Sequence, residues 1–185
     1  MGIITIIIFI ITLTASILLV GGLIFTLIMP KYRIWPPPSK KSWQFWISWV
    51  VTIISFVGTI ILSVLDWKNF IFIHWFRYPI GISLIVIGLF ILIWGVRTLS
   101  VHSTLGLKGK LIKDGPYKYS RNPQYLADII LYAGLIILAN SFFTLITGIL
   151  GILWNFLTPF TEEPWLKEQF KEEYDIYCRE VRRFI

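Results

Sequence analysis

Residues 122–160 read NPQYLADIILYAGLIILANSFFTLITGILGILWNFLTPF and decide the fold. They contain two apolar runs, and Asn140 and Ser141 form a short polar break between them. Each run approaches the length that crosses the hydrocarbon core of a bilayer, about 20 residues. We therefore expect two short antiparallel helices, at about 123–139 and 142–160, that fold back on each other as a tight hairpin.

Three more apolar runs precede this hairpin. Residues 3–29, 45–65 and 78–96 carry no charged side chain. The chain is 56% hydrophobic with a mean hydropathy of +0.75, which is more apolar surface than a soluble domain of this size can bury. The sequence thus predicts an all-α, polytopic protein, with one integral membrane domain over residues 1–185. We expect about five transmembrane helices: 3–29, 45–65, 78–98, 123–139 and 142–160.

The first of these runs is expected to be a retained span. It has no basic residue before it and is longer than the apolar core of a signal peptide. The connection that follows it, residues 35–49, combines Pro36-Pro37-Pro38 with four tryptophans. Prolines resist helix formation and indoles favour the headgroup layer. We expect this connection to lie at the membrane interface with a structural role.

The distribution of Lys and Arg predicts the orientation in the membrane. With five spans, 15 of the 17 basic residues fall on one side, and Lys68 and Arg77 fall on the other. The positive-inside rule then places the N-terminus outside and the C-terminus in the cytoplasm. The net charge of +7 is mostly this topology signal. Nucleic-acid binding is disfavoured, since the basic residues are not interleaved with an exposed aromatic platform.

The C-terminal tail shows a helical pattern. Apolar and aromatic residues recur there at spacings of four, four, three and four: Leu166, Phe170, Tyr174, Tyr177 and Val181. This periodicity predicts an amphipathic cytoplasmic helix that lies on the membrane or covers the end of the bundle. Glu162 and Glu163 are expected at its start, where the helix dipole favours carboxylates.

Polar residues converge at the cytoplasmic end of the hairpin. The antiparallel arrangement brings the start of one helix, RNPQY at 121–125, next to the end of the other, TEEPW at 161–165. The turn GPY at 115–117 lies just ahead of the first. Asn122 is expected to cap its helix, and the free N–H groups of that helix start suit an anionic ligand. The sequence therefore predicts a polar cleft at a membrane surface.

Asp128 lies deeper in the same predicted helix, on the face of Tyr125. A carboxylate inside a membrane span is costly and indicates a functional site. The alternative is a structural pair with Arg97 or with a tyrosine.

Several common cofactor sites are absent from the sequence. It has no Walker loop and no G-x-G-x-x-G motif. It has no zinc pattern either, because His74 and His102 are predicted on opposite sides of the membrane. We expect no metal site, and a cofactor would have to be bound by the helices and their cytoplasmic ends.

Two segments on either side of the hairpin resemble a known family. GPYKYSRNPQYL (115–126) and EEPWLKEQFKEEYDIYCREVRRF (162–184) are similar to the membrane methyltransferases that include isoprenylcysteine carboxyl methyltransferase and phosphatidylethanolamine N-methyltransferase. That family shares an arginine-histidine-proline-x-tyrosine motif, a helical hairpin and a glutamate pair. The resemblance covers about residues 95–184. It implies a binding site for S-adenosyl-L-methionine in a catalytic half at 97–185, whereas residues 1–76 look only membrane-like.

The resemblance also implies which residues form this site. The expected cofactor-binding residues are His102, Lys110, Leu111, Ile112, Tyr117, Asn122, Pro123, Gln124, Tyr125, Glu162 and Glu163. Tyr125 and Asp128 are the expected catalytic residues, and we expect Asp128 to attract or deprotonate the methyl acceptor. The acceptor would be a lipid or a lipidated molecule that enters from the bilayer.

Departures from the family pattern bear on the substrate. Asn122 replaces the histidine of the prenylcysteine enzymes, whereas phospholipid N-methyltransferases also have asparagine-proline there. Thr158 stands where the prenylcysteine enzymes have a substrate-contacting arginine. These differences favour a phospholipid or other amine-bearing acceptor over a prenylcysteine carboxylate.

Two other functions are compatible with the sequence. RNPQYLAD (121–128) also resembles a motif of the sterol reductases, in which an aspartate matches Asp128. That likeness implies an NADPH-dependent membrane oxidoreductase. The remaining alternative is a membrane scaffold whose polar cleft only binds lipid.

Overall fold

The computed structural model describes residues 2–67, 70, 75–99 and 101–185, and all regular elements in these ranges are helical. The α-helices are α1 (Ile3–Ile28), α2 (Trp43–Leu65), α3 (Arg77–Leu99), α4 (Val101–Thr104), α5 (Pro123–Ala139), α6 (Phe142–Phe170) and α7 (Glu172–Glu180). Short 3-10 turns are η1 (Pro30–Tyr32) and η2 (Gly115–Lys118). The predicted all-α class is therefore confirmed for the described residues.

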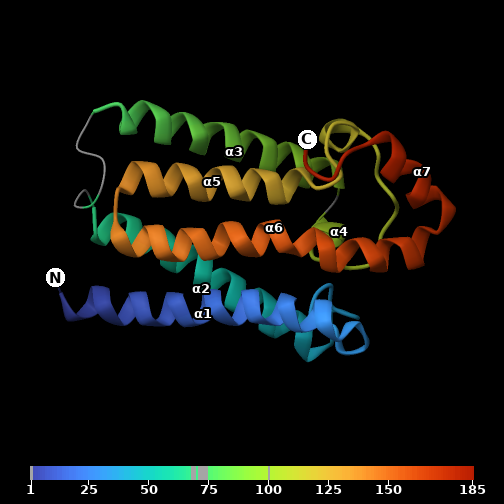
Figure 1. Cartoon of the computed structure of the whole chain (residues 1–185), viewed down its shortest axis with the longest axis horizontal. Helices are drawn as coiled ribbons and strands as arrows, with labels where there is room; N and C mark the ends of the chain where they lie inside the picture. The colour runs from blue at the N-terminus through green and yellow to red at the C-terminus, as the bar shows by residue number, and fades with distance from the viewer. Residues whose placement is uncertain (1, 68–69, 71–74, 100) are drawn as a thin grey trace.

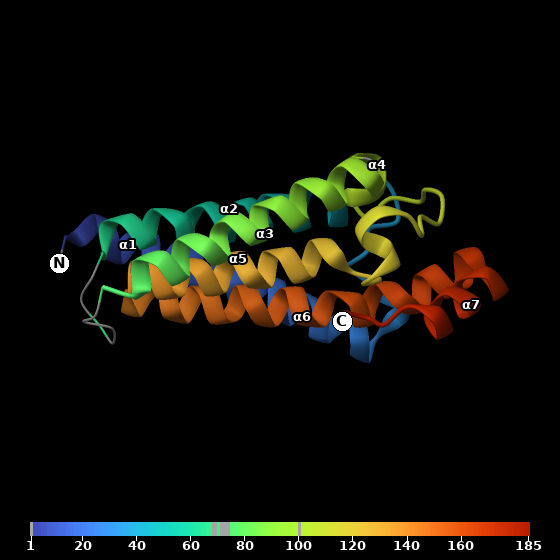
Figure 2. The ribbon, with the colours of Figure 1, turned by 90° about the horizontal axis from the view of Figure 1, so that it is seen from above.

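The long helices lie side by side in an elongated bundle (Figures 1 and 2). The N-terminus and the α5–α6 turn lie at one end, and the α1–α2 connection, α4 and α7 lie at the other (Figure 1). Four helices, α1, α2, α3 and α6, are long and apolar enough to cross a bilayer. The fifth, α5, is apolar but has 17 residues. The chain is thus a multi-pass membrane protein, and the count of five spans stays a prediction.

The hairpin forms where the sequence predicts it. Asn140 ends α5 in the left-handed backbone region, with φ of 51°, which asparagine adopts more readily than most residues. Ser141 then begins α6, because its Oγ accepts a hydrogen bond from the Thr144 N–H at 3.1 Å. The polar pair therefore supplies both the end of one helix and the cap of the next.

Glycines set how closely α3 approaches α5. Gly81, Gly88 and Gly95 are the glycines of α3, and all three are buried. A Cβ on Gly88 would lie 2.7 Å from the Leu131 side chain and 3.0 Å from the Ala127 carbonyl oxygen. Small residues allow such close contact between membrane helices. The three glycines therefore let α5, which carries several of the predicted site residues, pack closely against α3.

The last predicted span is longer than expected. α6 continues through Pro159 and Pro164 to Phe170. Threonine hydroxyls bond to carbonyls of the preceding turn, from Thr158 to Trp154 at 2.7 Å and from Thr161 to Thr158 at 2.8 Å. Side chains of this kind help membrane helices to tolerate proline. The prediction that Glu162 and Glu163 start a new helix was therefore wrong, because both lie inside α6.

The tail divides into two segments. α6 ends at Phe170, the residue that follows, Lys171, has φ of 48°, and α7 is a helix of nine residues after it. The predicted aromatic stripe is thus shared between the end of α6 and α7. Tyr174 and Tyr177 are buried in the protein. Whether α7 also contacts a membrane stays a prediction.

Candidate functional site

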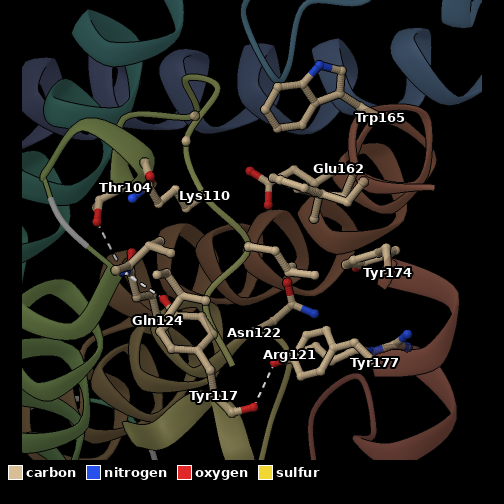
Figure 3. Close-up of a pocket in the computed structure, with 18 of the residues that line it drawn as sticks. Thr104, Lys110, Tyr117, Arg121, Asn122, Gln124, Glu162, Trp165, Tyr174 and Tyr177 are labelled. Atoms are coloured by element: carbon tan, nitrogen blue, oxygen red, sulfur yellow. Dashed lines mark hydrogen bonds between the residues drawn. The ribbon is translucent and has the colours of Figure 1, made fainter. Parts of the chain in front are cut away.

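A cavity of about 760 Å³, including its open mouth, lies at the end of the bundle that carries α4 and α7. Its walls come from the α3–α5 connection, the start of α5, the last turns of α6 and α7 (Figure 3). Residues from four separate segments thus line one cavity at this end of the bundle.

Most of the predicted cofactor residues line this cavity. They are Lys110, Leu111, Ile112, Tyr117, Asn122, Gln124, Tyr125 and Glu162. The hairpin accounts for this, since its antiparallel helices bring the start of α5 to the level of Glu162. The binding roles of these residues stay predictions.

Glu162 is held by two hydrogen bonds on one oxygen. Its Oε1 accepts from the Trp35 indole N–H at 2.7 Å and from the Tyr125 hydroxyl at 2.5 Å. Within the described ranges, its Oε2 has no hydrogen-bond partner. Figure 3 shows the carboxylate pointing into the cavity. The arrangement fixes the side chain while leaving one oxygen available to a ligand.

Trp35 is a site residue that the sequence analysis missed. It is 5% exposed and contacts Gly106, on which a Cβ would lie 2.9 Å from the indole ring. A buried indole N–H usually finds an acceptor, and here Glu162 provides it. The N-terminal half therefore contributes to the site, contrary to the expectation that residues 1–76 are only membrane-like. The sequence signal for this residue is a tryptophan directly before three prolines, a pattern for which the sequence analysis predicts only a structural role.

Gln124 joins the polar connection to α5. Its amide nitrogen donates to the Thr104 hydroxyl at 3.1 Å and to the Tyr117 hydroxyl at 3.0 Å (Figure 3). Burial raises the pKa of Tyr117 well above its ordinary value, so its hydroxyl stays protonated. The Tyr177 hydroxyl donates to the Tyr117 carbonyl at 2.7 Å. These bonds fix the cavity wall opposite Glu162.

Glu163 does not line the cavity, which differs from its predicted cofactor role. Its side chain is buried and forms ion pairs with Arg121 at 3.2 Å and with Arg183 at 2.7 Å. Successive helix residues point about 100° apart, and here Glu162 points into the cavity while Glu163 points toward the two arginines. Pro123 is fully buried at the start of α5 and also lies outside the lining. The side chain of His102 lies outside the described residues.

The chain end docks beside the cavity. We call residues 181–184 the C-terminal strap. Its carbonyl groups accept hydrogen bonds from the Arg121 N–H, at 3.0 Å, and from the Asn122 amide, at 3.1 Å. The predicted capping role of Asn122 was therefore wrong, because its side chain bonds to the strap and makes no capping bond to α5. The strap holds the RNPQY segment against α6.

The tail stripe supplies much of the remaining wall. Leu166, Phe170, Tyr174 and Tyr177 all line the cavity, together with Trp165 and several residues of the segment 99–109. The periodicity of these residues predicts an amphipathic helix that lies on the membrane or covers the end of the bundle, and their place in the cavity wall agrees with the second alternative. The residues of segment 99–109 had no motif that could have identified them.

A second cavity lies deeper in the bundle and contains Asp128. It measures about 980 Å³ including its open mouth and is lined by Trp35 and by residues of α2, α3, α4, α5 and α6. Thr104, Gln124 and Tyr125 line both cavities. Within the described part of the chain, Asp128 has no hydrogen bond or ion pair, so the alternative of a pair with Arg97 or a tyrosine is not found there. Of the two predicted catalytic residues, Tyr125 thus lies at the boundary between the two cavities, and Asp128 lies inside the second one.

A comparison with known families identifies the chain's relatives. A family model described as phospholipid methyltransferase matches residues 76–173, more than half of the chain. No curated protein and no solved structure matches. The matched range contains α3, α5, α6 and the lining of the first cavity up to Phe170.

Proposed function

Because the chain belongs to the phospholipid methyltransferase family, we propose that it is an integral membrane methyltransferase that uses S-adenosyl-L-methionine. Its methyl acceptor is a lipid or a lipidated molecule, and an amine-bearing lipid is favoured. The observation that carries this proposal is Glu162, whose Oε1 is fixed by Trp35 and Tyr125 while its Oε2 has no partner among the described residues.

The residues of the first cavity suit this cofactor. S-adenosyl-L-methionine supplies, when bound, a methyl group activated on a sulfonium, and it also carries ammonium, carboxylate, ribose and adenine groups. The free oxygen of Glu162 suits ammonium or hydroxyl donors. The N–H groups at the start of α5 and the Lys110 ammonium suit a carboxylate. The aromatic wall, with Trp165 and Tyr174, suits a cation or a flat base.

The second cavity suits the acceptor. Its lining is mostly apolar and lies deeper in the helical bundle. Burial of a hydrocarbon chain against such a lining is favourable. Tyr125, Gln124 and Thr104 border both cavities, so a head group there would lie next to the first cavity. Methyl transfer needs two reactants held in line with water excluded. Residues at this boundary are placed to orient them.

One buried threonine supports the amine-bearing acceptor. Thr158 is 0% exposed, and its hydroxyl donates to the Trp154 carbonyl at 2.7 Å. It therefore offers no positive charge to a substrate carboxylate, as the arginine of the prenylcysteine enzymes does. The carboxyl methyltransferase alternative is disfavoured for this reason.

The proposed orientation places the first cavity on the cytoplasmic side. The segments rich in Lys and Arg are the α1–α2 connection, the α3–α5 connection and the tail, and they gather at one end of the bundle (Figure 1). By the positive-inside rule this end is cytoplasmic and the N-terminus is outside. The soluble cofactor would then enter from the cytoplasm.

Isothermal titration of the purified protein in detergent tests the proposal. We expect S-adenosyl-L-methionine to bind, and Glu162→Gln to weaken binding about tenfold or more, because a charged acceptor is lost. Glu168→Gln, on an exposed residue of the same helix, is the matched control and should bind normally. Stabilisation by NADPH without any effect of S-adenosyl-L-methionine would instead favour the reductase. A folded protein that binds neither and methylates no lipid extract would favour the scaffold.

A further inference from the structure

The C-terminal strap is anchored to α6 through two of its side chains. The Arg183 guanidinium donates to the Glu163 carboxylate at 2.8 and 2.7 Å, and its Cζ lies 4.0 Å from the centre of the Phe160 ring. The Phe184 ring stacks on Phe156, with the ring centroids 5.5 Å apart. These contacts hold the backbone of the strap in a fixed position beside the start of α5.

The carbonyl oxygen of Arg183 determines how the Asn122 amide is oriented. It accepts a hydrogen bond from the Asn122 Nδ2 at 3.1 Å and another from the Ser120 hydroxyl at 3.3 Å. A carbonyl oxygen can only accept hydrogen bonds, so the nitrogen of the amide, and not its oxygen, must face the strap. The Oδ1 of Asn122 is thereby directed away from the strap.

This Oδ1 faces the first cavity as a free acceptor. Asn122 lines the cavity, and Figure 3 shows its side-chain oxygen directed toward the same space as the Glu162 carboxylate. Within the described residues the Oδ1 has no hydrogen-bond partner, and it keeps exposed surface, whereas the Arg121 Nε is fully buried. A ligand in the cavity can therefore reach it. The cavity thus offers two separate acceptors, the Glu162 Oε2 and the Asn122 Oδ1.

The charges around the two acceptors differ. Glu162 carries a carboxylate, which suits a cationic donor. Asn122 is neutral and directly precedes α5, whose first N–H groups carry a partial positive charge. The guanidinium-bearing Arg121, next to it in the sequence, lines the same cavity. A cation beside Asn122 would be repelled, whereas a neutral N–H or O–H group would not, so the Asn122 Oδ1 selects a neutral donor.

We propose that the C-terminal strap is a positioning device for ligand recognition in the first cavity. By holding the Nδ2 of Asn122, the Arg183 carbonyl presents the Oδ1 to a neutral hydroxyl or amino group of the ligand. Arg183 acts through Asn122 and is therefore a positioning residue. When the strap is released, the amide is free to rotate, and this acceptor is no longer fixed toward the ligand.

The identity of this ligand as S-adenosyl-L-methionine rests on the proposed function. The neutral donors of that molecule are its two ribose hydroxyls and the amino group of its adenine. S-adenosyl-L-homocysteine carries the same three donors. The recognition of a neutral donor by Asn122 therefore has three possible sources, which related ligands distinguish.

Four ligands test the recognition. S-adenosyl-L-homocysteine is compared with three analogues, which lack the 2′-hydroxyl, lack the 3′-hydroxyl, or carry an oxygen in place of the adenine amino group. Each is titrated into the purified full-length protein in detergent micelles, and the Kd is measured. We expect at least one analogue to bind the wild type about fivefold or more weakly, because a neutral hydrogen bond is lost.

Variants show whether this loss belongs to Asn122 and the strap. Asn122→Leu should weaken binding of S-adenosyl-L-homocysteine about fivefold, and Arg183→Ala about threefold or more, without further weakening one of the deficient analogues. That analogue identifies the donor. A merely structural role would lower the affinity for all four ligands equally. Arg183→Lys, which keeps a cation beside Glu163, should restore most of the affinity. Arg179→Ala removes the same charge from an exposed position of α7 and should bind all four ligands like the wild type.

Hydrogen exchange reports on docking of the strap without any ligand. The Arg121 N–H donates to the Arg182 carbonyl at 3.0 Å, so its exchange should be slow in the wild type and faster in Arg183→Ala. A chain that ends at Glu180 lacks this acceptor and is the second variant, for use if Arg183→Ala leaves the strap docked. Faster exchange with an unchanged ligand preference would overturn the proposal, and so would slow exchange in the shortened chain.

The same titrations separate this inference from the proposed function. Binding of S-adenosyl-L-homocysteine with equal losses for all four ligands in the variants would overturn the inference alone. Failure of the folded wild type to bind either S-adenosyl-L-methionine or S-adenosyl-L-homocysteine would overturn the proposed function, and the recognition proposed for Asn122 with it.

Discussion

At the scale of single residues, the contact between Trp35 and Glu162 links the two halves of the chain. Trp35→Phe keeps an aromatic ring but removes the N–H that donates to the Glu162 carboxylate. Hydrogen bonds to charged groups contribute about 1.5–3 kcal/mol, so we expect weaker S-adenosyl-L-methionine binding, by about fivefold or more, in isothermal titration. Trp43→Phe, on an exposed tryptophan, should bind like the wild type. Equal affinities of the two variants would contradict the positioning role of Trp35.

The ion pairs of Glu163 with Arg121 and Arg183 are expected to stabilise the folded protein. Arg183→Ala leaves the buried carboxylate of Glu163 with Arg121 alone. Arg183 is partly exposed and solvent screens its charge, so we expect a loss of about 1–2 kcal/mol, measured by unfolding in mixed micelles. Arg179→Ala, an exposed arginine of α7, should have no effect. In a double-mutant cycle, Glu163→Gln should cancel most of the loss, and simple additivity would argue against the pair.

At the scale of elements, the α3–α5 contact depends on missing side chains. A Cβ at Gly88 would lie 3.0 Å from the Ala127 carbonyl oxygen, which is backbone and cannot rotate away. Gly88→Ala should therefore separate the helices and lower stability by about 1–3 kcal/mol, seen as a lower thermal unfolding midpoint. Gly21→Ala on α1 is the matched control, because its Cβ would meet nothing within 4 Å. An unchanged unfolding midpoint for Gly88→Ala would contradict the close approach of α3 to α5 at this position.

Local patterns predicted the elements better than the contacts between them. The Asn140-Ser141 pair located the hairpin, because its polar side chains interrupt an apolar run and then end one helix and cap the next. The full length of α6 could not be read in the same way, since proline usually breaks a helix and its tolerance depends on neighbouring threonines.

In the candidate site, too, the sequence predicts local geometry better than contacts between distant segments. The hairpin geometry sufficed to bring Tyr125 next to Glu162, because a short turn fixes the register of two antiparallel helices. It could not place Trp35, which is 127 positions from Glu162 in the sequence. The different directions of the Glu162 and Glu163 side chains depend on their place inside α6. Contacts of this kind depend on how the helices pack and are not encoded in a local motif.

At the scale of the whole molecule, the five-span arrangement predicts that the two chain ends lie on opposite sides of the membrane. Cys178 is the single cysteine and lies in α7, at the end of the bundle expected to face the cytoplasm. A membrane-impermeant maleimide should label it in inverted vesicles and not in right-side-out vesicles. In a Cys178→Ser background, Ser39→Cys in the α1–α2 connection should label like Cys178, and Gly2→Cys should label from the opposite side. An even number of spans places Gly2 and Cys178 on the same side, so labelling of both in one vesicle type would show that α5, the shortest of the long helices, does not cross the membrane by itself.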